Sequence, residues 1–324
     1  MNLRAVFTQD RLPVLATFGV AIALYIIAGT QFQGFFSARV FFNFLSDNAY
    51  LGIIAVGLTF VILSGGIDLS VGSVVGCTGI MLAVMIQKLH WHPALGCLAV
   101  LGFGLVLGLG QGYLIQAYRL PPFLVTLVGL FLCRGIGLWV SKESVQIAHP
   151  WFTDLTRFKI GVVSGASLPL VSLIFLLVLV AGIVVARQTR FGRTVYAIGG
   201  SEGSAVLMGL PVARTQVAIY ALSGFCAALA GIVYALYTSS GNAISGTGME
   251  LDAIAAVVIG GTLLSGGYGS VFGSFLGVLI LGMIQTAITF QGTLSSWWTK
   301  IFIGVLLLAF VLLQKVIQRS LDRS

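Results

Sequence analysis

The sequence predicts an all-α polytopic membrane protein with about ten transmembrane helices, some of them broken at glycine-rich points. Three observations predict this fold. The chain has 324 residues, of which 58% are hydrophobic and only 8% are charged, whereas soluble domains have roughly 25% charged residues. Its apolar residues gather in runs of about 20, the length that crosses a bilayer. A glycine-rich segment also occurs in both halves of the chain as an internal repeat. We therefore expect a single transmembrane domain over residues 1–324.

The spans follow from apolar runs that charged or turn-forming residues separate. Arg4 and Arg11 precede the first run and no small-residue cleavage site follows it, so we expect this run to be retained as the first span. Gly104, Gly108 and Gly112 recur every four residues and predict close packing of the fourth span against a neighbouring helix. The predicted spans lie near residues 12–30, 47–66, 70–87, 93–118, 121–141, 166–186, 215–238, 250–265, 269–290 and 297–314.

The basic residues predict the orientation of the chain. With the N-terminus inside, ten Lys and Arg residues lie on the cytoplasmic side and six on the outer side, while Arg134 falls within a span. Because an excess of basic residues marks the cytoplasmic side, both termini are expected in the cytoplasm. Trp297, Trp298 and Lys300 would then anchor the last span at the outer interface. This topology accounts for the net charge of +8, and no nucleic-acid partner is expected.

The internal repeat contains a break in an apolar run. Residues 53–76 align without gaps on residues 254–277 at an offset of 201, with identities at ten of 24 positions. Both copies contain Leu-Ser-Gly-Gly, and a new helix is expected to start within a few residues of it. Paired glycine-interrupted segments in the two halves of a membrane protein indicate a transport pathway. We predict that four glycines act as gating hinges: Gly65, Gly66, Gly266 and Gly267.

The longest polar segment on the predicted cytoplasmic side covers residues 187–214. Within it Ser201 can cap a short helix that ends at Met208, because glycines precede it and Pro211 prevents its continuation. A short helix parallel to the membrane suits docking into a groove of a partner, and an ordinary solvated loop is the alternative. The residues expected to make the contact are Ser201, Glu202, Gly203, Ser204, Ala205 and Met208.

No set of residues predicts catalysis or a metal site. His90, His92 and His149 fall in predicted outer loops without a positioned nucleophile or carboxylate, and the four cysteines lie in apolar spans. The sequence also lacks the Gly-x-x-x-x-Gly-Lys-Ser/Thr loop that binds nucleotide phosphates. We therefore expect a protein that is not an enzyme, that binds no cofactor of its own and that takes its energy from a partner.

Three motifs resemble one known family. They are G-L-T-F-V-I-L-S-G-G-I-D-L-S-V-G-S over residues 57–73, F-G-R-T-V-Y-A-I-G-G-S-E-G-S-A-V-L-M-G over 191–209, and E-L-D-A-I-A-A-V-V-I-G-G-T-L-L-S-G-G over 250–267. They resemble the permease subunits of bacterial ABC importers for ribose and related sugars, and the resemblance covers nearly the whole chain. Residues 292–300, G-T-L-S-S-W-W-T-K, further resemble one of the two permeases of the galactofuranose importer.

The resemblance implies an inner-membrane sugar importer that works by alternating access. Its other parts would be a second permease, a different chain in the galactofuranose-type system, together with a cytoplasmic ATPase that uses ATP and Mg²⁺ and a periplasmic sugar-binding protein. The resemblance also implies that the segment from Ser201 to Met208 is the coupling helix seated on the ATPase. Here the sequence departs from the family, because Ser201 stands where Asn is usual and Gly203 is a weak helix former.

Polar groups at the ends of spans are the candidates for the sugar pathway. A neutral sugar exchanges hydrogen bonds with hydroxyl and amide groups and needs no charge. We predict that four such residues line the pathway, and hydrogen bonding to a neighbouring helix is the alternative for each: Asn48, Ser64, Ser265 and Gln285.

Three carboxylates are predicted to cap helices. Asp68 lies in the first break, where capping of the following helix is favoured over a gating or partner contact. Thr247 and Glu250, three residues apart, have the pattern of a capping box, and Asp252 is expected in the first turn of the same helix, where a carboxylate is favourable.

Two other classes of transporter remain open. A branched-chain amino acid importer shares the architecture, but its zwitterionic cargo is expected to need more charge along the pathway than Asp68 and Arg134 provide. A secondary transporter would need carboxylates that couple ions to transport.

Overall fold

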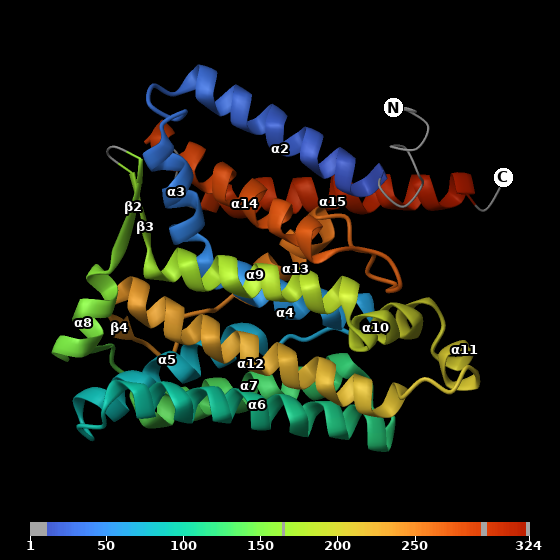
Figure 1. Cartoon of the computed structure of the whole chain (residues 1–324), viewed down its shortest axis with the longest axis horizontal. Coiled ribbons are helices and arrows are strands. Elements are labelled where there is room, and N and C mark those ends of the chain that lie inside the picture. The colour runs from blue at the N-terminus through green and yellow to red at the C-terminus, as the bar shows by residue number, and fades with distance from the viewer. Residues whose placement is uncertain (1–11, 164–165, 293–296, 322–324) are drawn as a thin grey trace.

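The computed structural model describes residues 12–163, 166–292 and 297–321, and this part of the chain is a bundle of helices (Figure 1). Most of the long helices lie side by side along the long axis of the molecule. The helices are α2 (Leu12–Gln31), α3 (Ala38–Asp47), α4 (Ala49–Leu63), α5 (Val71–Gln87), α6 (Pro93–Tyr118), α7 (Pro122–Val140), α8 (Pro150–Arg157), α9 (Leu170–Gln188), α10 (Arg190–Gly200), α11 (Glu202–Leu207), α12 (Val212–Thr238), α13 (Met249–Ile259), α14 (Val271–Gln291) and α15 (Trp297–Leu321).

Two short antiparallel ribbons accompany the helices. Strand β1 (Val145–Gln146) pairs with β4 (Ser240–Gly241), and β2 (Lys159–Val163) pairs with β3 (Ala166–Pro169). Both ribbons lie at the end of the bundle opposite α11 (Figure 1). The prediction of a purely helical chain missed them, and the predicted span 166–186 begins too early, because its first four residues form β3 and α9 starts only after Pro169.

The described helices include six that are long and apolar enough to cross a membrane. These are α2, α6, α7, α9, α12 and α14, and a seventh span results if α3 and α4, which meet at a bend of 56°, count as one. Helix α13 has 11 residues, which is about 16 Å of helix against a hydrocarbon core of about 30 Å. A multi-pass helical membrane protein is thus confirmed, whereas the predicted number of ten spans is not.

The second break begins earlier than the repeat predicts. In the first copy α4 continues to Leu63, directly before Ser-Gly-Gly, and α5 starts at Val71. In the second copy α13 already ends at Ile259, because Gly260 and Gly261 follow it and Gly261 takes a φ of +91°. A residue without a Cβ adopts this left-handed backbone readily. The predicted span 250–265 is therefore a half-span followed by a long non-helical connection.

Helix α12 runs through the interior and packs closely against α6. A Cβ on Gly104 would overlap the carbonyl oxygen of Gly224, and a Cβ on Gly108 would overlap the carbonyl oxygen of Tyr220. Such close backbone approach is the usual role of small residues four apart in membrane helices. The predicted packing role of these glycines is therefore confirmed.

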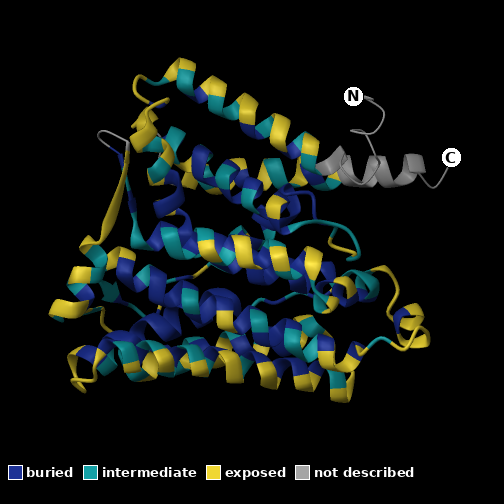
Figure 2. Ribbon diagram, in the orientation of Figure 1, coloured by how far each residue is buried: buried dark blue, intermediate teal, exposed yellow. Residues whose placement is uncertain are grey.

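The burial pattern separates an inner set of helices from an outer set. Helices α4, α5 and α12 are mostly buried, whereas α2 and α6 alternate buried and exposed residues (Figure 2). The exposed residues of the outer helices include large apolar ones, such as Val106, Phe131 and Leu177. Apolar side chains on the outside of such a bundle have the hydrocarbon of the bilayer as their natural solvent.

Candidate functional site

The two glycine-rich breaks meet in space although 201 residues separate them in the sequence. The backbone N–H of Gly267 donates to the carbonyl oxygen of Leu63 at 2.8 Å. Gly65, Gly266 and Gly267 adopt φ values of +80°, +84° and +76°, which only glycine takes without strain. A Cβ on Gly66 would instead collide with the hydroxyl of Tyr220. The four predicted hinge glycines thus lie at one place, although their role as hinges stays a prediction.

The end of α10 lies against the same place. A Cβ on Gly199 would overlap both the carbonyl oxygen of Leu63 and the amide of Gly267, and a Cβ on Gly267 would crowd Gly200. Three glycine pairs, one from each break and one from α10, therefore form a single contact, which we name the glycine junction: Gly65, Gly66, Gly199, Gly200, Gly266 and Gly267.

A tyrosine of α10 ties this helix to the second break. The Tyr196 hydroxyl donates to the carbonyl oxygen of Gly269 at 2.9 Å. Burial raises the pKa of the Tyr196 hydroxyl, although nearby Arg187 opposes part of the rise, so this hydroxyl stays protonated and able to donate. Sequence reasoning missed the junction, because Gly199 and Gly200 were read only as the residues that precede the short helix.

The short helix predicted after Ser201 is present as α11. The Ser201 hydroxyl accepts from the N–H of Ser204 at 3.2 Å, and Met208 is the C-cap residue. Helix α10, which the prediction of a polar loop over 187–214 missed, lies directly before it. Most of α11 is exposed, and the side chains of Leu207 and Met208 are 89% and 66% exposed. Helix α11 lies at one end of the bundle (Figure 1). Its exposed apolar residues Leu207 and Met208 form a tip there.

One residue of α11 faces inward. Ala205 is fully buried and packs in a small separate cluster with Ile198 of α10 and Val212 of α12. Glu202, Gly203 and Ser204 are exposed. Helix α11 is thus fixed to α10, and α10 in turn contacts both breaks, so that a continuous path of contacts leads from α11 to the glycine junction.

Ser201→Ala is expected to loosen α11, because the substitution removes its N-cap. Loss of such a cap costs about 1 kcal/mol, which corresponds to roughly fivefold faster amide exchange if the helix opens locally. Hydrogen exchange of the peptide that covers 202–208 measures this change. Ser201→Asn keeps an acceptor at the cap and should exchange like the parent protein; equal exchange of the alanine variant and the parent would contradict the capping role.

A cavity of about 540 Å³ lies between the start of α4, α13, α14 and α15. Its wall contains two of the four predicted pathway residues, Asn48 and Gln285. The other two lie at the glycine junction instead: the Ser64 hydroxyl donates to the Val61 carbonyl at 2.7 Å, and the carbonyl oxygen of Ser265 lies next to Gly65. The structure therefore divides the predicted pathway residues between two places. The remaining wall of the cavity is formed by Tyr50, Leu51, Met249, Asp252, Leu281, Ile288, Thr289, Gly292, Trp297, Thr299, Lys300 and Ile303.

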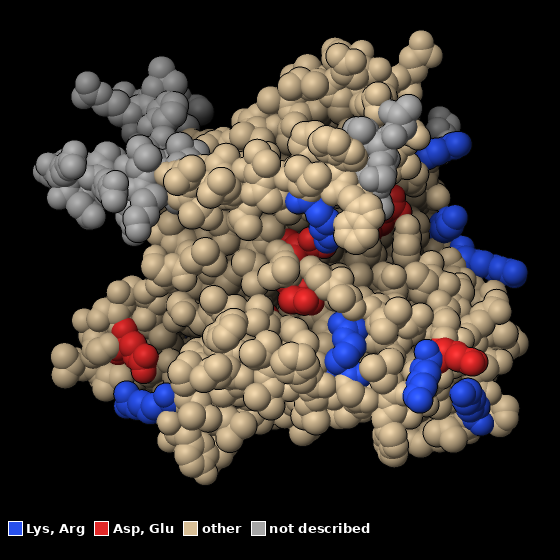
Figure 3. Space-filling model, turned by 180° about the vertical axis from the view of Figure 1, so that it is seen from behind, with Lys and Arg blue, Asp and Glu red and all other residues tan. Residues whose placement is uncertain are grey.

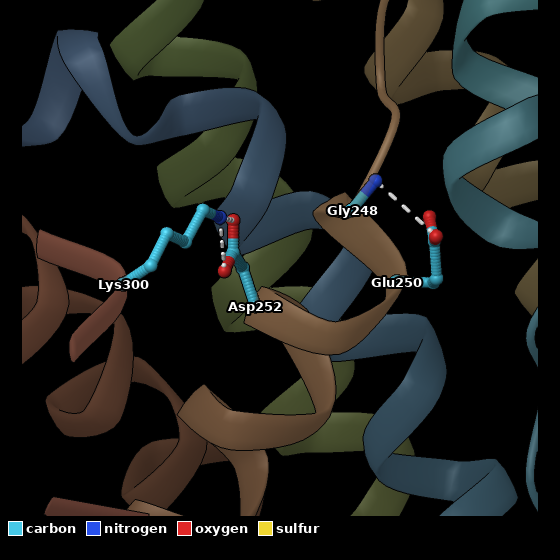
Figure 4. Close-up of polar contacts among 4 residues, drawn as sticks. All are labelled: Gly248, Glu250, Asp252 and Lys300. Carbon is cyan, nitrogen blue, oxygen red and sulfur yellow. Dashed lines mark hydrogen bonds and ion pairs between the residues drawn. The ribbon is translucent and has the colours of Figure 1, made fainter. Parts of the chain in front are cut away.

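Two residues of the cavity wall, Asp252 and Lys300, form an ion pair. The Lys300 ammonium of α15 lies 2.7 Å and 2.6 Å from the two carboxylate oxygens of Asp252 of α13 (Figure 4). The prediction that Asp252 lies in the first turn of a helix is confirmed, and its side chain turns toward α15. Seen from behind, acidic and basic side chains lie together near the middle of the molecule, and further charged side chains lie toward its edges (Figure 3). Sequence reasoning could have found the pair, because charges among apolar residues usually pair with one another.

The capping prediction for Glu250 is confirmed in part. Its Oε1 accepts from the N–H of Gly248, the N-cap residue of α13, at 3.2 Å (Figure 4). Thr247 does not complete a capping box, because its hydroxyl donates to the carbonyl of Ile244 instead. The second carboxylate oxygen of Glu250 is buried and has no partner among the described residues.

Asp68 fixes the first break to the interior. This fully buried carboxylate accepts from the N–H and the hydroxyl of Ser70, at 2.9 Å and 2.6 Å, and from the hydroxyl of Ser223 in α12 at 2.7 Å. It therefore shapes the turn that leads into α5 and joins that turn to α12. The predicted cap of α5 itself is not formed, because Asp68 bonds Ser70 and not an N–H within α5, and the N-cap residue Ser70 makes no side-chain capping bond. Within the described ranges no three His, Cys, Asp or Glu side chains are grouped so as to hold a metal ion.

Comparisons with known proteins identify the family. Residues 40–311 match the family model for the permease component of the branched-chain amino acid transport system. The inner membrane ABC transporter permease protein YjfF of Escherichia coli K12 is 53% identical over 307 residues, which cover 95% of this chain and 93% of the relative. The fructose import permease protein FruG of Bifidobacterium longum is 40% identical, with 96% and 93% covered.

A third relative is named for the import of ribose. The ribose import permease protein RbsC of Escherichia coli K12 is 36% identical over 313 residues, which cover 95% of this chain and 96% of the relative. No solved structure matches the chain. The motifs, the helical membrane fold and these matches over nearly the full length lead to one conclusion: the chain belongs to the family of ABC-transporter permeases, among the sugar permeases of the ribose type.

Proposed function

We propose that the chain is the translocation subunit of an ATP-driven importer that passes a monosaccharide from the periplasm to the cytoplasm. The observation that carries this proposal is the match over nearly the full length to permeases named for fructose import, ribose import and xylose transport. The likeness of residues 292–300 to a galactofuranose permease supports galactofuranose or a related sugar as the cargo. The relative named as an inner membrane protein supports the same membrane for this chain. The excess of basic residues on the predicted inner side supports both termini in the cytoplasm.

The proposed partners follow from the parts that the chain lacks. The described residues form a membrane bundle, and the sequence has no phosphate-binding loop, so ATP and Mg²⁺ would be used by a separate cytoplasmic ATPase. A periplasmic binding protein would deliver the sugar. A second permease, a different chain in galactofuranose-type systems, would complete the pathway.

The proposed coupling uses the contacts of α11. Its exposed apolar tip at Leu207 and Met208 suits a groove of the ATPase. When ATP binding brings the ATPase halves together, α11 would carry α10 with it, and Gly199 at the end of α10 lies against both breaks. Movement of the breaks would then turn the pathway from one side of the membrane to the other. Alternating access of this kind needs discontinuous helices near the pathway.

The experiment that tests this function is reconstitution of the assembled transporter. The tagged chain is purified in mild detergent with its co-expressed ATPase and second permease, placed in liposomes and supplied with ATP and a periplasmic binding protein. We expect both partners to co-purify and radiolabelled sugar to accumulate only with ATP. Uphill uptake by the isolated chain without an ATPase would instead indicate a secondary transporter.

A branched-chain amino acid is the second candidate cargo, because the matching family model carries that description. Uptake of radiolabelled leucine, valine and isoleucine in the same liposomes distinguishes the two. We expect sugar uptake without leucine uptake, since a single neutral ion pair lies in the described cavity. Uptake of leucine in place of sugar would contradict the proposal.

A further inference from the structure

We propose that the cavity between α4, α13, α14 and α15 is a binding site for the sugar in transit, in which the Asp252 carboxylate accepts hydrogen bonds from sugar hydroxyls and Lys300 holds that carboxylate in position. The inference rests on the proposed function, because it names where the cargo of that function binds. The close-up in Figure 4 shows Asp252 and Lys300 reaching toward each other from the two helices.

The place of the ion pair is hard to explain by stability alone. The Lys300 side chain is 52% exposed and that of Asp252 is 21% exposed, because both border the cavity instead of packing in the core. Exposed ion pairs contribute little to stability, and a lysine predicted at the outer interface needs no carboxylate partner to remain charged. The pair is therefore better explained by a ligand that enters the cavity and donates hydrogen bonds to the remaining lone pairs of the Asp252 carboxylate.

The chemistry of the wall fits a neutral polyol. A carboxylate offers four lone-pair sites, of which the ammonium of Lys300 uses only some, so adjacent hydroxyls can donate to the rest. Gln285 projects an amide that can donate and accept, and Tyr50 and Trp297 add aromatic surface with a polar edge. Asp252 and Lys300 cancel each other's charge, which disfavours an ionised cargo. A site of about 540 Å³ also falls within the roughly 300–1,000 Å³ of small-molecule sites.

The site is placed so that movement of the break can change it. Asp252 lies in the first turn of α13, and this helix leads within 11 residues to the break that contacts Leu63 and Gly199. Lys300 lies on α15 and is not part of either break. Displacement of α13 at the glycine junction would thus change the distance between Asp252 and Lys300, so that release of sugar follows the movement that ATP drives.

The competing explanation is that the ion pair only clamps α13 to α15. The test uses the complete reconstituted transporter with its ATPase and binding protein, and radiolabelled ribose, fructose, xylose and galactose as probes, the last of which equilibrates with galactofuranose in water. Asp252→Asn, Lys300→Met and the exchange Asp252→Lys with Lys300→Asp are compared with Glu143→Gln, which removes a charge from an exposed connection after α7. The ATP hydrolysis rate and the thermal midpoint show whether each assembly is intact.

We expect Asp252→Asn to lower uptake at least tenfold, mainly through a higher KM, and Lys300→Met to lower it less, because the carboxylate remains. The exchanged pair should regain the thermal midpoint without regaining uptake, and Glu143→Gln should transport like the parent. Full uptake by Asp252→Asn, or recovery of uptake by the exchanged pair, would contradict the sugar-binding role of Asp252. The ion pair would then only hold α13 against α15. If the parent assembly imports none of the sugars, the proposed function itself fails, which is a separate outcome.

Discussion

Gly199→Ala is expected to lower ATP-driven sugar uptake between about fivefold and 150-fold while the protein still inserts into the membrane. The added Cβ would overlap the carbonyl oxygen of Leu63 and the amide of Gly267, the two groups whose 2.8 Å hydrogen bond joins the breaks. An added methyl in such a closely packed place costs about 1–3 kcal/mol, and a coupling energy of that size corresponds to about 5- to 150-fold. Uptake into liposomes that contain the complete transporter measures the loss.

The neighbouring glycine provides a matched control. A Cβ on Gly200 meets nothing within 4 Å, so Gly200→Ala adds the same methyl one residue further along without the overlap. We expect this variant to keep most of the uptake. Equal transport by the two alanine variants would show that the junction does not need the close approach of α10, and the proposed route from α11 to the breaks would then be wrong.

Local features were predictable because they depend on neighbours in the sequence. Ser201 was predicted to cap a short helix, and its hydroxyl indeed accepts from the N–H of Ser204. The first break was predicted between the apolar run and Val71, and α4 and α5 end and begin there. Glycine and proline decide such ends through their own backbone preferences, so no knowledge of distant residues is needed.

Helix length in the second half was not predictable from hydropathy alone. Residues 253–265 carry no charge and are mostly apolar, which favours a full span, yet α13 stops at Ile259. Two consecutive glycines at Gly260 and Gly261 end it, and a Cβ on Gly260 would overlap the backbone of Gly273 in α14. The close approach of α14 thus requires glycine at position 260. That requirement comes from a neighbouring helix and does not change the hydropathy of the run.

The functional contacts were the least predictable part, because they join distant segments. The pairing of Leu63 with Gly267 and of Asp252 with Lys300 depends on how the helices pack. The repeat at least indicated that the two breaks do the same work, which is a reason to expect them near one pathway. No repeat or other pattern pointed to Gly199, because the start of the short helix after Ser201 already explained why a glycine stands there.

Ala205→Pro is expected to abolish coupled uptake while ATP hydrolysis continues. Proline has no N–H, so the bond from Ala205 to the carbonyl of Ser201 at 3.0 Å is lost, and proline inside a helix costs about 3 kcal/mol or more. A helix of six residues cannot offset this loss. Ala205 is also the contact that seats α11 against Ile198 and Val212. Sugar uptake and phosphate release from the same liposomes measure the two activities.

Ala205→Gly separates the loss of the helix from the loss of the side chain. It keeps the N–H and removes only a methyl from the small cluster around Ile198 and Val212, so its uptake should fall less than that of the proline variant. Size-exclusion chromatography shows whether each variant still assembles with the ATPase. If the proline variant assembles and transports like the parent, the contact between α11 and α10 does not carry the movement. If it assembles and hydrolyses ATP without uptake, the movement of the ATPase no longer reaches the glycine junction, because α11 carries the exposed tip at Leu207 and packs against α10 through Ala205.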